Sequence, residues 1–278
     1  MTKKVFVVNA RGEREQFSFQ KVLRSAKRAG APQGVAQGIA KEIEKRAYDG
    51  IKTFEIFGQV KERLKREQPQ AALRFNLKGA MRGMGPTGFP FEVFVGGIFS
   101  KLGFQVLLNQ FIRGKCLEHE VDFLARKEGQ FKIGECKYHN LAENKVGSAV
   151  VLEVEARFRD LKEGFLKKRQ EKAEMMIVTN TKFSERAVKY AKCSGIELWG
   201  WKYPPGGGLE KLIDTKKLYP ITILPSLDKW ASRVFSDQKM MLAQDVLSPY
   251  AQELLTKKGI KKQHLLRLQK EAELLLGN

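Results

Sequence analysis

The stretch that decides the fold is residues 121–137, which read VDFLARKEGQFKIGECK. Two apolar-rich runs, 121–125 and 131–137, have the composition of β-strands and flank Glu128-Gly129, a pair typical of a hairpin turn. A two-residue loop and a four-residue loop give the same pairing, in which Asp122 faces Glu135 and Arg126 faces Phe131. The sequence therefore predicts an antiparallel hairpin with a defined register.

This register brings charged side chains together. Residues directly opposite in an antiparallel pair project to the same face, with β-carbons about 4.5–5.5 Å apart. Lys137 follows Glu135 by two residues, so it is expected on that face as well. We therefore predict that Asp122, Glu135 and Lys137 meet at one end of the hairpin.

Two carboxylates and one ammonium group leave an excess of negative charge, which a divalent cation would neutralise. Mg²⁺, or Mn²⁺ in its place, binds one or two carboxylates together with water and substrate phosphate. Such a metal acidifies bound water and stabilises charge on phosphate, as phosphodiester hydrolysis requires. Lys137 would orient or deprotonate the water, or offset the developing charge. A cross-strand salt bridge at the surface explains the same spacing without any chemistry.

The rest of the chain predicts an α/β protein with three parts. Gly83 to Pro90 is dense in Gly and Pro, so we place a domain boundary there. After it, helices and strands alternate, which indicates a mixed sheet with helices on both faces. The expected helices are 90–102, 148–172 and 184–193, and the expected strands are 104–108, 121–125, 131–137, 175–179 and 196–201. The predicted domains are residues 1–84, a strand pair followed by helices; residues 85–226, the mixed sheet; and residues 227–278, wholly helical.

The charge balance points to a polyanionic partner. The 278 residues include 51 Lys and Arg against 31 Asp and Glu, a formal net charge of +20. An excess of this size is typical of nucleic-acid binders, although a merely basic surface would give the same count. No apolar run is long enough for a membrane helix or a signal peptide, so a cytoplasmic protein without a membrane partner is expected. Three scattered cysteines support neither a disulfide framework nor a zinc site.

Residues 85–225 resemble the PD-(D/E)XK nuclease superfamily, in particular its Mrr-like restriction endonucleases. The resemblance is carried by Phe91-Glu92, by Asp122, by Glu135-Cys136-Lys137, and by the later stretches 177–184 and 195–198. It implies that Asp122 and Glu135 are metal ligands, that Lys137 positions water, and that Glu92 completes this metal site or a second one. Val121 stands where the superfamily name has proline.

Residues 7–32 resemble the ATP-cone, a nucleotide-sensing domain, with support from 48–53 and 72–76. The resemblance implies binding of ATP or dATP, for which Lys21, Arg11 and Arg14 are the candidate ligands. The family usually has Lys-Arg-Asp-Gly in the first turn, whereas this chain has Asn-Ala-Arg-Gly at 9–12. A degenerate dimerisation or nucleic-acid-binding module is the alternative.

The combined expectation is a Mg²⁺-dependent endonuclease, homo-oligomeric, that cuts double-stranded DNA, responds to a nucleotide effector and acts in defence against foreign DNA. Two alternatives stay open. One is a nucleotide-responsive DNA-binding regulator on a nuclease scaffold that no longer cuts. The other is an RNA-directed nuclease.

Overall fold

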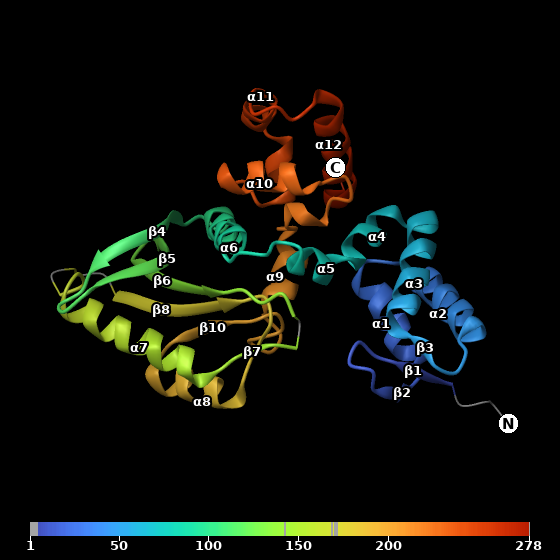
Figure 1. Ribbon diagram of the computed structural model, residues 1–278, viewed down its shortest axis with the longest axis horizontal. Helices are drawn as coiled ribbons and strands as arrows, with labels where there is room; N and C mark the ends of the chain where they lie inside the picture. Colours follow the sequence, from blue (N-terminus) through green and yellow to red (C-terminus); the bar gives the residue numbers. More distant parts are fainter. Residues whose placement is uncertain (1–4, 142, 168, 170–171, 278) are drawn as a thin grey trace.

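The computed structural model describes residues 5–141, 143–167, 169 and 172–277, which form three lobes (Figure 1). The first lobe combines a small sheet with four helices. Strand β1 (Phe6–Val8) pairs antiparallel with β2 (Arg14–Gln16) and parallel with β3 (Ile51–Lys52). The helices are α1 (Phe19–Arg28), α2 (Gln33–Arg46), α3 (Thr53–Glu67) and α4 (Pro69–Phe75). These helices enclose a hydrophobic cluster of their own, which includes Ile39, Ile43 and Leu64.

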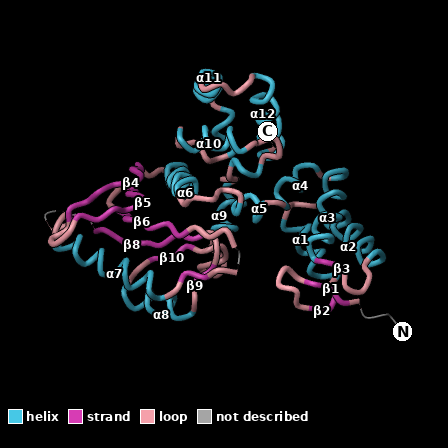
Figure 2. The backbone as a smooth tube through the Cα atoms, in the orientation of Figure 1, coloured by secondary structure: helices cyan, strands magenta, loops and turns pink. Residues whose placement is uncertain are grey.

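The central lobe is built on a five-stranded sheet in the order β10-β8-β6-β5-β4 (Figure 2). Its strands are β4 (Gln105–Arg113), β5 (Glu118–Lys127), β6 (Gln130–Lys137), β8 (Lys172–Thr179) and β10 (Glu197–Trp199). Strands β4, β5 and β6 are antiparallel neighbours, and β6, β8 and β10 run parallel. The prediction of a mixed sheet is confirmed, and the hairpin has the predicted register, with Arg126 opposite Phe131.

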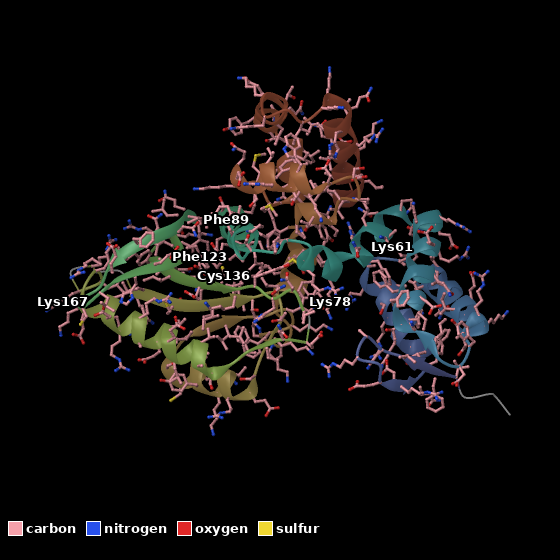
Figure 3. The ribbon with its side chains drawn as sticks, viewed as in Figure 1. Lys61, Lys78, Phe89, Phe123, Cys136 and Lys167 are labelled. Carbon is pink, nitrogen blue, oxygen red and sulfur yellow. The ribbon has the colours of Figure 1, made fainter. Side chains whose placement is uncertain are left out.

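Helices cover both faces of this sheet. Helix α6 (Phe89–Lys101) lies on one face, and α7 (Ser148–Glu163) and α8 (Glu185–Ser194) lie on the other (Figure 1). Phe123 and Cys136 belong to the hydrophobic core on the α6 side (Figure 3). Val121 and Ile133 belong to a second core, on the side of α7 and α8. A short parallel pair, β7 (Lys145–Val146) with β9 (Lys182–Phe183), lies beside the sheet.

The helix expected over 148–172 was predicted too long, since α7 ends at Glu163. The turn that follows packs closely against another part of the chain, because a Cβ at Gly164 would lie 2.3 Å from the carbonyl carbon of Gly114. Phe165 continues the apolar pattern past the end of the helix, but it packs against Phe131 of β6, at 6.4 Å between ring centroids. The apolar periodicity therefore reports burial beyond the point where the helix stops.

The last lobe is helical. It contains α9 (Leu209–Lys216), the 3-10 turns η1 (Ile221–Ile223) and η2 (Ala243–Leu247), α10 (Lys229–Asp237), α11 (Pro249–Lys257) and α12 (Lys262–Leu276), and α5 (Leu77–Arg82) packs beside η1. Its apolar side chains share one core with α6. The boundaries at 84/85 and 226/227 stay predictions. Among the described residues, the search for membrane-spanning segments finds no helix with the length and apolarity to cross a bilayer.

The end of α12 is held by the first lobe. Gln70 and Arg74 of α4 donate to the carbonyl oxygen of Leu275, at 3.2 and 3.1 Å. Lys217 donates to the carbonyl oxygen of Leu276 at 2.5 Å. Carbonyl groups in the last turn of a helix lack partners within the helix, and cationic donors satisfy them well. The first and last parts of the chain are therefore joined directly.

Gly134 provides a test of the packing between β6 and α6. A Cβ at this position would lie 2.0 Å from ring atoms of Phe123, which is fully buried and packs on Phe99. We expect Gly134→Ala to lower the free energy of unfolding by about 1–3 kcal/mol, because the core must shift to admit one methyl group.

The matched control is Gly147→Ala, since Gly147 has a φ of −84° and open space around it. Chemical denaturation of both variants measures the effect. Equal stability of the two variants would contradict the packing described between Gly134 and Phe123.

Candidate active site

The site is organised by a kink in the β4–β5 ladder. Leu108 pairs with Phe123 and Gln110 pairs with Val121, but the ladder skips the position between them, where Asn109 has a φ of +52°. In a regular strand Val121 and Phe123 would point to the same face. Here Val121 is buried on the α7 side and Phe123 on the α6 side. Asn is among the few residues that tolerate the left-handed conformation, so it can hold such a kink.

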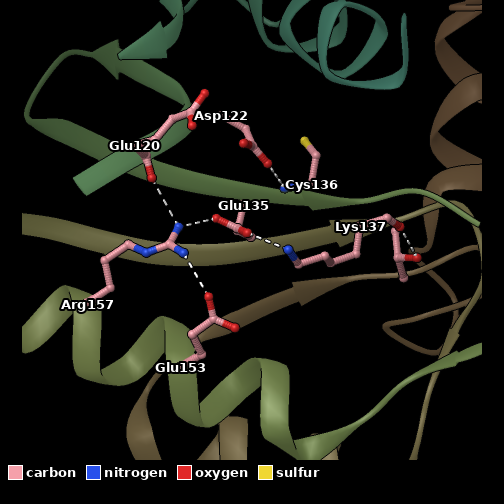
Figure 4. A network of polar contacts seen from close by, with 8 residues as sticks. Glu120, Asp122, Glu135, Cys136, Lys137, Glu153 and Arg157 are labelled. Atoms are coloured by element: carbon pink, nitrogen blue, oxygen red, sulfur yellow. Dashed lines mark hydrogen bonds and ion pairs between the residues drawn. The ribbon is translucent and has the colours of Figure 1, made fainter. Parts of the chain in front are cut away.

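Asp122 lies at this kink. Its Oδ2 accepts a hydrogen bond from the backbone N–H of Cys136 at 2.6 Å, just beyond the last ladder pair of β5 and β6 (Figure 4). Burial, and next the negative charge of Glu135, raise the pKa of Asp122 to about 7. The carboxylate of Asp122 thus lies between β5 and β6 at the kink. Its raised pKa means that it ionises less readily than an exposed aspartate.

Glu135 is the most secluded carboxylate of the site, with 4% of the residue exposed. Its Oε1 lies 2.7 Å from Nζ of Lys137, and its Oε2 accepts from a guanidinium nitrogen of Arg157, a residue of α7 (Figure 4). Arg157 also donates to the carbonyl oxygen of Glu120 and to Glu153, each at 3.1 Å. The structure therefore joins Glu135 and Lys137 as an ion pair on the α7 side, and it adds an arginine from the covering helix.

Glu92, from the first turn of α6, reaches the same region. Its Oε2 accepts from Nδ2 of Asn109 at 2.9 Å. Burial raises the pKa of Glu92, and the charges of Glu120 and Glu135 add to that rise, while the Asn109 hydrogen bond opposes it. Glu92 in turn contributes to the raised pKa of Asp122. The carboxylates of Glu92, Asp122 and Glu135 are therefore coupled through their charges.

This donor set fits a hard cation. Among the described residues, no group of three or more His, Cys, Asp or Glu side chains is arranged to hold a metal ion. Mg²⁺ does not need such a group, because it keeps several waters and takes one or two carboxylates. Burial, and next the charge of Glu135, raise the pKa of Asp122 to about 7, and a bound cation would favour its ionised form. Asp122 and Glu135 are the residues that would hold the ion, with Glu92 beside them.

Two residues of the site escape sequence reasoning. Arg157 lies next to the buried Phe158 in the helix, and nothing in its spacing distinguishes it from the exposed cations of α7. Asn109 has a weak signal, a polar residue that directly follows the apolar run Val106 to Leu108. Only the three-dimensional pairing reveals that it bonds to Glu92.

The nucleotide ligands predicted in the first lobe are separated in the structure. Lys21 pairs with Glu15 at 2.6 Å and lines a cavity of about 170 Å³, together with Phe17, Phe57 and Phe75. Arg14 instead pairs with Asp49 at 2.6 Å, and neither Arg11 nor Arg14 lines the cavity. Of the three, Lys21 alone contacts this enclosed space.

Comparisons with known proteins agree with the central part of this description. A family model described as a restriction endonuclease (Mrr type) matches residues 84–202, and a model described as AF1548-like, C-terminal, matches residues 219–276. An uncharacterized protein of Archaeoglobus fulgidus is 37% identical over 176 residues, which are 63% of this chain and 95% of that protein. Both family matches begin after residue 83, and the predicted ATP-cone lies outside them.

Two solved structures are similar to parts of this chain. The crystal structure of a protein of unknown function, AF1548, is similar with a TM-score of 0.59 and 34% identity, over 69% of this chain and 99% of that chain. MspJI restriction endonuclease in complex with a 27-mer oligonucleotide has a TM-score of 0.33 and 13% identity, over 73% of this chain and 36% of that chain. The resemblance of the central domain to restriction endonucleases is thus confirmed by the family match to residues 84–202.

Asp122 makes the stability of the metal-free protein depend on pH. Its pKa in the folded state is about 7, above the ordinary value of 3.8, so folding favours the protonated form. Stability is therefore complete below pH 4 and declines as the pH rises to about 7. Asp122→Asn cannot ionise, so at pH 8 it should be more stable than the parent by about 1–2 kcal/mol, allowing for residual solvent contact.

Denaturation at pH 4 and pH 8 in the presence of a chelator measures this difference. Asp237→Asn, at an exposed position of α10, is the control and should change little at either pH. Added Mg²⁺ should stabilise the parent at pH 8 but not Asp122→Asn. A variant less stable than the parent at pH 8 would refute the assignment of Asp122 as a strained carboxylate.

Proposed function

The chain belongs to the AF1548-like family and carries a domain of the restriction-endonuclease type, and from this premise we propose that it is a metal-dependent DNA endonuclease. The observation that carries the proposal is the arrangement around Glu135, which is buried, ion-paired with Lys137 and Arg157, and coupled to the ionisation of Asp122. Perturbed carboxylates beside an ordered lysine are typical of sites that cleave phosphodiesters with a metal.

In this proposal, each residue of the site has a separate role. Asp122 and Glu135 would hold the cation through their carboxylate oxygens, and Glu92 would be a further ligand there or at a second ion. The bound Mg²⁺ or Mn²⁺ supplies acidified water and stabilisation of charge on the phosphate. Lys137, fixed by its ion pair at 2.7 Å, orients that water or donates to the phosphate oxygens. Arg157 is a positioning residue, because it holds Glu135 without taking part in the reaction.

The substrate is argued from charge. A net charge of +20 favours a polyanion, and double-stranded DNA is the substrate proposed. The non-cutting regulator is disfavoured because Glu92, Asp122, Glu135 and Lys137 are all present, and a site retired from catalysis has no physical need for this combination. The RNA-directed nuclease is separated from the main proposal by offering both nucleic acids.

The test is cleavage by single-site variants. Asp122→Ala, Glu135→Ala and Lys137→Ala should each lower the rate of Mg²⁺-dependent plasmid nicking by at least about 100-fold, because each removes a metal ligand or the lysine. Glu174→Gln is the matched control, since Glu174 pairs with Lys132 on the same sheet away from the site. Gel assays with supercoiled plasmid, single-stranded DNA and structured RNA measure rate and substrate together.

Salt-sensitive DNA binding should survive in all three alanine variants. If the alanine variants nick as fast as the parent, the site assignment is wrong. If the parent binds DNA without cutting it at any concentration of Mg²⁺ or Mn²⁺, the regulator replaces the endonuclease.

For the first lobe we propose nucleotide sensing, with ATP or dATP as effector. The support is the cavity of about 170 Å³, which is lined by Lys21, by its ion-pair partner Glu15 and by aromatic rings. Pockets that enclose a whole small molecule measure about 300–1,000 Å³, so this one would enclose only part of a nucleotide. Lys21 would then face the charged part of the ligand.

Lys21→Gln should weaken ATP or dATP binding by about tenfold, the effect expected for one charge-assisted hydrogen bond. Titration calorimetry on the full chain measures the affinity, and Lys45→Gln, at an exposed position of α2, is the control. Unchanged affinity in Lys21→Gln would remove this cavity from the proposal. Nicking assays with and without the nucleotide then show whether binding regulates cleavage.

A further inference from the structure

A pocket of about 480 Å³ lies along the edge strand β4, on residues that the proposed catalysis does not use. Its wall comes from β4, from Leu124 and Arg126 of β5, from Phe131 of β6 and from the turn after α7. The volume falls in the range of about 300–1,000 Å³ that is usual for small-molecule sites. The pocket is therefore large enough to bury a ligand.

The charge of the wall selects an anion. Arg113 and Arg169 line the pocket, as does Arg126, which also takes part in an interaction of its own. Guanidinium groups bind phosphate through paired N–H donors. A ligand that enters this pocket is thus expected to carry phosphate or a comparable anion.

The rest of the wall fits a flat ring with polar edges. Phe111 is 66% exposed on β4, where it offers a bare aromatic face. The guanidinium carbon of Arg169 lies 4.1 Å from the ring centroid of Phe165 and 5.9 Å from that of Phe131. Nucleobases stack on aromatic rings and on guanidinium planes alike. The amide groups of Gln105 and Gln110, which also line the pocket, can donate to and accept from base edges.

The pocket adjoins the catalytic carboxylates through the strand pairing. Gln110 pairs with Val121, the residue before Asp122. Asn109, the residue before Gln110, donates a hydrogen bond to the Glu92 carboxylate. One wall of the pocket is therefore the strand that pairs with the segment leading into Asp122.

We infer that this pocket receives one unpaired nucleotide of the nucleic acid, with its base stacked beside Phe111 and its phosphate held by Arg113 and Arg169. The inference rests on the proposed function, and it adds a substrate class, DNA that contains an unstacked or extruded base. Bases inside a regular duplex have their faces covered by neighbours, so only an unstacked base can enter.

The test is DNA binding by the full chain in the presence of a chelator, so that cleavage plays no part. Fluorescence anisotropy compares a duplex that carries one bulged nucleotide with the fully paired duplex. We expect the parent to bind the bulged duplex at least about fivefold more tightly, as stacking of one base allows. With 2-aminopurine as the bulged base, binding should also change the fluorescence of the base.

Phe111→Ala combined with Arg113→Gln should abolish this preference, since it removes the stacking face and one cation. Both side chains are exposed, so the fold should tolerate the change. The matched control is Leu152→Ala with Arg186→Gln, an exposed apolar residue of α7 and an exposed arginine of α8. The control loses the same charge and should keep the preference.

Equal affinity of the parent for the two duplexes overturns the inference, and so does a preference that survives in Phe111→Ala/Arg113→Gln. Sedimentation experiments test whether the β4 face that carries Phe111 instead joins two copies of the chain. If Phe111→Ala abolishes self-association and the parent binds both duplexes equally, this face is such a contact and the inference fails. Cleavage of plasmid without a preference for bulged DNA refutes the pocket alone. A preference that depends on Phe111 without any cleavage refutes the endonuclease and supports the nucleotide pocket.

Discussion

The ion pairing of the Glu135 carboxylate is the constraint on which the site depends. A carboxylate removed from water must be paired, because an isolated buried charge is strongly unfavourable. Arg157 and Lys137 provide that pairing from two different elements, helix α7 and strand β6 itself. The contact between Arg157 and Glu135 also ties α7 to the end of the sheet where the carboxylates lie. Loss of Arg157 would therefore disturb the packing of the helix and the chemistry of the site together.

The kink at Asn109 has the complementary effect. Strand alternation alone would leave Asp122 on one face of a regular sheet, whereas the kink directs its carboxylate to the backbone N–H of Cys136. Asn109 also bonds to Glu92, so one residue with a left-handed backbone links α6, β4 and β5 around the carboxylates. Carboxylates gather at the kink, whereas the pocket along β4 is lined by arginines. A metal and a phosphate require these opposite environments.

The sequence predicted the parts that depend on local periodicity. The hairpin register followed from the turn residues Glu128-Gly129, and the mixed sheet followed from the alternation of helices and strands. The end of α7 was missed because Phe165 continues the apolar pattern beyond the helix. Arg157 and Asn109 were missed because their roles arise from contacts between elements distant in sequence, which no spacing rule encodes. The roles of Glu92, Asp122, Glu135 and Lys137, and of Lys21, Arg11 and Arg14, stay predictions.

The hydrogen bonds from Gln70, Arg74 and Lys217 to the last turn of α12 have a practical consequence. They connect helix α4 of the first lobe, and Lys217 after α9, to the end of α12. A chain shortened before Leu275 would lose both acceptor carbonyl groups, and with them this connection between the lobes. The last turn of α12 is thus a structural part of the protein, and trimming it in the laboratory should weaken the attachment of the first lobe.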